Sequence, residues 1–127
     1  MTSEVESAID EVRQAFPGHE VDAEPEPDGG AVVFVRDLPI GAQYAPSRSW
    51  IGFRIGFQYP YEDIYPHYMD PGVQRADGQP LGEGFHQQRP WRGSPATMIS
   101  RRSNHRDPAL ETAAIKLAKV IQWMEQR

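Results

Sequence analysis

The chain has 127 residues, of which 39% are hydrophobic and 24% charged, a composition typical of one globular domain rather than of a disordered chain. It contains no cysteine, which excludes disulfides, thiolate metal sites and a cysteine nucleophile. The net charge of −5 lacks the strongly basic balance of a nucleic-acid-binding protein, and no apolar run approaches the roughly 20 residues that cross a bilayer. We therefore expect a single cytoplasmic domain over residues 1–127, with no nucleic-acid partner and no membrane partner.

The charges are distributed unevenly along the chain. Residues 1–30 contain nine acidic side chains and one basic side chain, whereas residues 74–106 contain six arginines and two acids. The arginine-rich segment, with Arg101 and Arg102 adjacent in it, is interpreted as a docking face for an acidic partner or a phosphate. The alternative is a solvated loop that balances the acidic end of the same fold. The sequence leaves both interpretations open.

Residues 3–16 are predicted to form an amphipathic helix. Ser3 and Glu6 have the spacing of a capping box, and Pro17 with Gly18 ends the helix. The apolar residues recur at helical spacing and form a face that packs on a sheet: Val5, Ala8, Ile9, Val12 and Phe16.

Three strands are predicted next, over residues 19–24, 31–35 and 50–58. The first is short and polar, as expected at the edge of a sheet, and the second is rich in valine. The third alternates strictly, with Gly52 and Gly56 on a face that either lets another group approach closely or marks an edge. The opposite face of this strand is predicted to be buried and consists of Ile51, Phe53, Ile55 and Phe57.

Residues 59–106 keep no regular period, and we expect one or two short strands in them, most clearly near 96–100. A final helix is predicted over 108–126, with Asp107 as its N-cap. The short links between the predicted strands favour antiparallel pairing. The sequence therefore predicts an α+β domain in which an N-terminal and a C-terminal helix pack on an antiparallel β-meander.

The order of these elements resembles the ubiquitin-conjugating enzyme fold, and the resemblance is sharpest where the alternating strand ends. Phe57, Tyr59-Pro60 and Tyr65-Pro66 look like the family's strand that runs into a Tyr-Pro pair and then a further proline. Residues 104–108, Asn-His-Arg-Asp-Pro, look like the family's Trp-x-Pro element before its helix, with the tryptophan lost. The family's His-Pro-Asn tripeptide is absent. Bacterial members of the superfamily look closest.

The resemblance implies a function without the family's chemistry. The family carries a ubiquitin-like protein as a thioester on a cysteine, and by order along the chain that cysteine's place falls near residues 97–100, with Met98 as the best match. The chain is thus similar to ubiquitin-conjugating enzyme variants, which keep the fold and lose the cysteine. The implied role is a non-catalytic binding or scaffold subunit, without a cofactor, in a bacterial ubiquitin-like modification system. Its partner would be a ubiquitin-like protein, an activating enzyme or an active conjugating subunit.

The Tyr-Pro stretch is predicted to leave the sheet with an extended backbone, because each proline biases the preceding residue away from the helical region. Tyrosine adds contact area at low entropic cost and is favoured at interfaces. We therefore interpret Tyr59, Tyr61, Tyr65 and Tyr68 as a docking surface for the protein partner. The alternative is that their rings cap the open end of the sheet core.

Two further functions remain open from the sequence. An enzyme of the same fold would gather His67, His86 and His105 in segment 59–106 as an acid–base or metal site, although their spacing matches no short ligand motif. A purely structural interaction domain of the RWD type would need neither chemistry nor metal. No serine lies in a nucleophile-elbow motif. Trp91, among arginines, either stacks with them or plugs the core as the anchor of its loop.

Overall fold

A computed structural model describes all residues, 1–127, as two helices and an antiparallel sheet of six strands. This confirms the predicted α+β class with antiparallel pairing. The helices are α1 (Ser3–Ala15) and α2 (Ala113–Glu125), and neither has the length and apolar character needed to cross a membrane. In spatial order the sheet contains β1 (Val21–Pro25), β2 (Ala31–Pro39), β4 (Arg48–Ile55), β5 (His67–Met69), β8 (Thr97–Ile99) and β7 (Phe85–His86). A separate two-stranded sheet pairs β3 (Tyr44–Ala45) with β6 (Gln74–Arg75).

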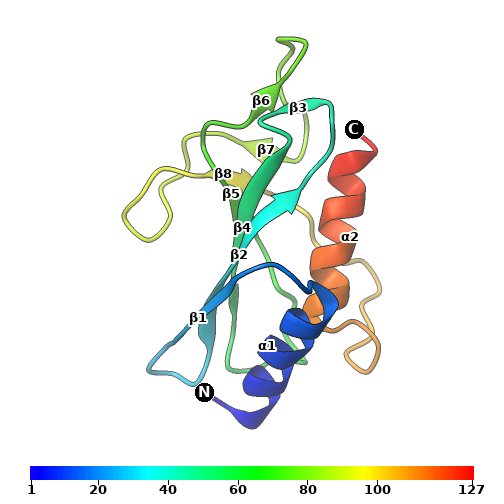
Figure 1. The fold of residues 1–127 in the computed structure, drawn as a ribbon. Helices are drawn as coiled ribbons and strands as arrows, with labels where there is room; N and C mark the ends of the chain where they lie inside the picture. Colours follow the sequence, from blue (N-terminus) through cyan, green and yellow to red (C-terminus); the bar gives the residue numbers. More distant parts are fainter.

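The core lies between the sheet and the helices. Figure 1 shows α1 and α2 on one side of the sheet, which we call the inner face. The inward side chains of β2 and β4 are fully buried because strand residues alternate between the two faces, and the helices cover them with their apolar stripes. The principal core residues are Val5, Ile9, Val12, Val33, Val35, Ile51, Phe53, Ile55, Leu117, Val120 and Met124.

The outer face of the sheet is covered in part by the loop between β7 and β8, which lies on the side opposite the helices (Figure 1). Trp91 in this loop stacks on Tyr68, with ring centroids 4.5 Å apart and an interplanar angle of 8°. A Cβ added to Gly52 would lie 2.5 Å from the Trp91 ring, so this glycine is the one that permits a close approach. Trp91 therefore anchors its loop on the outer face, and it neither enters the core nor stacks with an arginine.

Both helices are capped by residues other than the predicted ones, and α2 therefore begins later than predicted. The hydroxyl of Thr2, not that of Ser3, accepts the hydrogen bond from Val5 N at 3.1 Å. Asp107 accepts from Ala109 N within a single turn, and the backbone then becomes extended at Thr112. The hydroxyl of Thr112 accepts from Ile115 N and starts α2 there, five residues later than predicted.

Strand β4 ends at Ile55, two residues before the predicted limit of its buried face. Gly56–Tyr59 forms a turn, with Tyr59 N donating to Gly56 O at 3.1 Å, and the side chain of Phe57 is left 50% exposed. The predictions of a buried Phe57 and of an extended chain through Tyr59-Pro60 are therefore wrong. Once the turn breaks the alternation, the side chain at 57 no longer points to the core.

Phe53 and Phe57 give a matched pair of variants for measuring stability. Phe53→Ala should lower the unfolding free energy by about 3–5 kcal/mol, because it empties a fully enclosed site in the core. Phe57→Ala removes the same atoms from a half-exposed site and should cost less than about 1 kcal/mol. Urea unfolding of both variants measures this difference, and equal losses would contradict the assignment of the inner face.

Candidate functional site

A cluster of charged side chains joins three segments that are distant in sequence. Lys116 on α2 is almost completely buried, and its Nζ donates to both carboxylate oxygens of Asp63, at 3.0 and 3.1 Å. The third donor of Nζ points to Ser103 Oγ at 2.6 Å, and the backbone N–H of Ser103 donates to Asp63 at 2.9 Å. Lys116 therefore holds the segment after β8 and the loop after β4 against the helix.

The same cluster continues along the segment that precedes α2. The carboxylate of Glu111 is buried and lies 3.2 Å from Arg106 Nε and 3.0 Å from Lys119 Nζ. Arg106 Nε also lies 3.8 Å from Asp63, so the two carboxylates share this guanidinium. The charge of each buried carboxylate is thus compensated by at least two cations, as burial of charge requires.

The protonation of both carboxyl groups follows from these contacts. Burial by itself raises the pKa of Asp63, but the Ser103 N–H and the Lys116 ammonium outweigh it and hold the pKa below its ordinary value. Burial also raises the pKa of Glu111, and the Ser103 hydroxyl with the Lys119 and Lys116 ammonium groups brings it below the ordinary value. Both groups are therefore carboxylates at neutral pH.

The Ser103–Lys116 contact is not a nucleophile with its base. A lysine that activates a serine must accept the hydroxyl proton, and for this it must be a neutral amine with a free lone pair. Lys116 is an ammonium whose three hydrogens are directed to Asp63 and Ser103. The cluster therefore has the properties of a structural clamp, and it carries no acyl-transfer chemistry.

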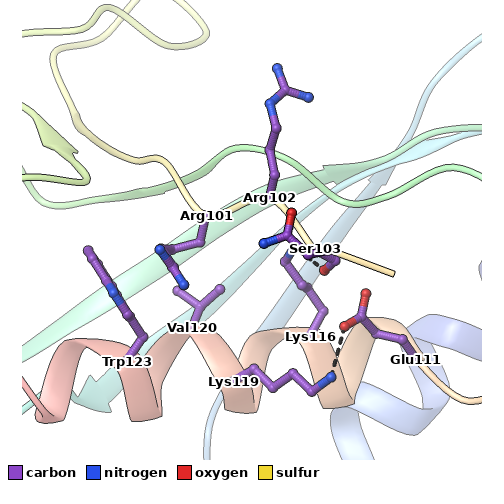
Figure 2. Close-up of a pocket in the computed structure, with 9 residues that line it drawn as sticks. Arg101, Arg102, Ser103, Glu111, Lys116, Lys119, Val120 and Trp123 are labelled. Carbon is purple, nitrogen blue, oxygen red and sulfur yellow. Dashed lines mark hydrogen bonds and ion pairs between the residues drawn. The ribbon is translucent and has the colours of Figure 1, made fainter. Parts of the chain in front are cut away.

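A pocket of about 210 Å³ opens beside this clamp, between the segment that follows β8 and one face of α2. Figure 2 shows Arg101 directed along the helix toward Val120 and Trp123, whereas the guanidinium of Arg102 is turned away from the pocket. The lining residues are Arg101, Arg102, Ser103, Asn104, Glu111, Lys116, Lys119, Val120 and Trp123. The pocket is thus polar and predominantly basic.

The four tyrosines predicted as one docking surface lie in four different environments. Tyr59 is buried, and its hydroxyl accepts from Ala113 N at 3.2 Å, so its ring caps the core as the alternative predicted. Tyr68 stacks under Trp91 on the outer face. The hydroxyl of Tyr65 lies 2.6 Å from Ser100 Oγ, and its ring lies beneath the Arg102 guanidinium, 3.9 Å from it. Tyr61 alone is freely exposed, at 81%.

A second candidate surface lies where Tyr61 and Phe57 leave the core. Two adjoining hollows between the 57–61 loop and the first turns of α1 share Glu4, Tyr59 and Pro60 in their walls. We call this surface the loop groove, lined by Ser3, Glu4, Ser7, Ala8, Glu11, Phe57, Gln58, Tyr59, Pro60 and Tyr61. Phe57 was missed as a surface residue because the strand pattern includes it in the buried face.

The charges of the basic segment are balanced only in part by the acidic end of the chain. Arg92 pairs with Glu24 at 2.8 Å, but the other acidic residues near β1 pair with Arg36 on β2 and Arg54 on β4. Arg101 and Arg102 form no ion pair. Their charges are therefore available to a ligand or partner.

The three candidate histidines do not form one site. His67 is on the inner face of β5, His86 is on the outer face of β7 opposite Met98, and His105 is exposed in the segment before α2. No group of three histidine, aspartate or glutamate side chains is arranged to hold a metal ion. Met98, the position matched to the family's cysteine, lies inside β8 beside Tyr68 rather than in an open cleft.

His67 is a buried imidazole without a hydrogen-bond partner at either ring nitrogen. It packs on the Phe53 ring, with centroids 5.2 Å apart. Burial, and then the positive charge of Lys116, lowers the pKa of His67 to about 3. The ring is therefore neutral at physiological pH and is unavailable as a general acid.

Comparison of the chain with protein-family models, with curated proteins and with solved structures finds no match. The functional argument consequently depends on the geometry of the loop groove and of the basic pocket.

The environment of His67 predicts a loss of stability in mild acid. Because its folded-state pKa lies below its ordinary value of 6.5, the unfolded chain takes up the proton first as the pH falls. Between pH 6.5 and 5.0 this group should cost about 1.6 kcal/mol of unfolding free energy, because the unfolded imidazole is on average about 80% protonated there and a full proton is worth about 1.4 kcal/mol per pH unit. Urea unfolding across this range measures the loss.

His67→Leu should remove that part of the pH dependence and leave the fold intact, since an apolar group of similar size fills the site. His105→Leu, at an exposed position, is the control and should retain it. A pH dependence that is the same in all three proteins would show that His67 is not a neutral buried imidazole.

Proposed function

We propose that the chain is a non-catalytic, ubiquitin-conjugating-enzyme-like binding or scaffold subunit of a bacterial ubiquitin-like modification system. The observation that supports it is the path of the chain. After α1, the strands β1, β2, β4 and β5 are antiparallel neighbours in chain order, the Tyr-Pro pairs lie between β4 and β5, and α2 follows the long irregular segment. This is the order from which the resemblance was drawn, and the chain has no thiol to carry a thioester.

The loop groove is the surface best suited to a protein partner. Phe57 and Tyr61, four positions apart, are 50% and 81% exposed and line the same hollow. Large aromatic rings that are exposed in a monomer mark interaction sites. Glu4 of α1 lines the hollow that holds these rings, and Glu11 lines the adjoining one, so the groove suits a partner segment in which an apolar side chain lies next to basic ones.

The enzymatic alternative receives less support from the geometry. Its histidines are separated by the sheet, and the one serine beside a lysine faces an ammonium. The RWD-like alternative shares the fold and differs only in lacking a partner from the modification system, so a binding measurement separates the two.

The binding test uses a bacterial ubiquitin-like protein and its cognate activating enzyme. Tyr61→Ala and Phe57→Ala should each weaken binding of the preferred partner by about 1–3 kcal/mol, measured by calorimetry, with the melting temperature unchanged. Leu110→Ala removes another exposed apolar side chain, 69% exposed and outside the groove, and should bind like the unmodified chain. Absence of binding to either protein would favour the structural alternative.

Incubation of the chain with the same two proteins and ATP should give no adduct that a thiol reagent cleaves on a non-reducing gel, because no cysteine is present. A cleavable adduct would refute the non-catalytic assignment.

In the binding test, a drop in the melting temperature of Tyr61→Ala would show that this ring supports the core, which would contradict the docking assignment.

A further inference from the structure

The basic pocket beside the clamp has an excess of positive charge that the chain does not compensate. Arg101 forms no ion pair, and its guanidinium lies over the Trp123 ring, 4.9 Å from the centroid. Around it the carboxylates of Asp63 and Glu111 offset two of the three cations Arg106, Lys116 and Lys119. With Arg101 the net charge of these six groups is +2, which one dianion would neutralise; Arg102, whose guanidinium is turned away from the pocket, is left out of this sum.

The segment that lines the pocket also has backbone hydrogen-bond donors without acceptors in the chain. The backbone N–H groups of Arg101, Arg102 and Asn104 donate to no group of the chain, whereas that of Ser103 is used by Asp63. The ammonium of Lys119 reaches Glu111 from a side chain that is 61% exposed, so it retains free donors toward the opening. Lys116 contributes charge only, since its three hydrogens are already directed to acceptors.

The size and chemistry of the pocket select one ligand class. Its volume of about 210 Å³ is below the roughly 300–1,000 Å³ of pockets that enclose drug-sized ligands, so it accommodates a single small group. Guanidinium and ammonium donors around a net charge of +2 match the oxygens of a phosphate dianion better than a singly charged carboxylate. We propose that the pocket binds one phosphate group, either free phosphate or the terminal group of a phosphomonoester whose remainder lies against Trp123.

The experiment is a titration of the full ¹⁵N-labelled chain with inorganic phosphate at constant ionic strength, followed by NMR. We expect saturable shifts of the backbone amides of residues 101–104 and of the Trp123 indole. Arg101→Gln and Arg101→Ala should weaken phosphate binding at least about tenfold, the effect of losing one charge-assisted contact. Arg89→Ala is the matched control, because it removes the same charge from an exposed arginine that forms no ion pair and does not line the pocket.

Equal weakening by the Arg101 and Arg89 variants would overturn the proposal, because it would indicate diffuse attraction rather than a site. Failure to saturate below about 10 mM phosphate, or an equal response to acetate, would overturn it as well.

Adenosine monophosphate, with adenosine as its uncharged control, separates the two sources of the ligand. Tighter binding of the nucleotide than of phosphate assigns the pocket to a phosphomonoester, and equal binding assigns it to free phosphate. The proposed protein docking at the loop groove uses other residues, so either proposal can fail alone.

Discussion

The contact between buried Lys116 and partly buried Asp63 is the constraint on which the irregular half of the molecule depends. A buried ion pair adds little stability over apolar packing, because both charges lose their hydration. Removal of one partner, however, leaves the other as an uncompensated charge inside the protein. Here the pair also recruits Ser103 and, through Arg106, Glu111. These contacts take the place of strand pairing for the segment between β8 and α2, which has no regular structure of its own before α2.

Both proposed sites are positioned by that contact. Asp63 lies two residues after Tyr61, so the anchor that fixes the carboxylate also fixes the loop that lines the groove. Ser103 lies two residues after Arg101, so the same anchor forms the wall of the basic pocket. The sheet and its core supply the support for α2, and the ionic cluster determines what the loops around α2 present to a ligand.

Periodicity in the sequence predicted those elements whose residue pattern repeats over neighbouring positions. Strict alternation located the buried face of β4, and a short β-rich run located β8, because both depend on neighbouring residues in sequence. Phe57 was misassigned because the turn at Gly56 interrupts the alternation, and α2 was begun too early because Thr112 caps it in place of Asp107. The ionic cluster was not predicted, since Asp63 and Lys116 are 53 positions apart and neither stands in a motif. The four tyrosines lie close together in the sequence but do not form one surface. Two short turns between β4 and β5 give their rings different orientations.

The central claim is that Lys116 orders the segment between β8 and α2, and hydrogen exchange of the Lys116→Met variant tests it most directly. The account predicts faster exchange of the Ser103 amide and of the Ala109 to Glu111 amides, with exchange in β2 and β4 unchanged. Lys119→Met, which removes the same charge from a largely exposed side chain, should leave the Ser103 amide protected, because Lys119 pairs with Glu111 and not with Asp63. Unchanged protection of Ser103 in Lys116→Met, or an equal loss throughout the sheet, would contradict the account.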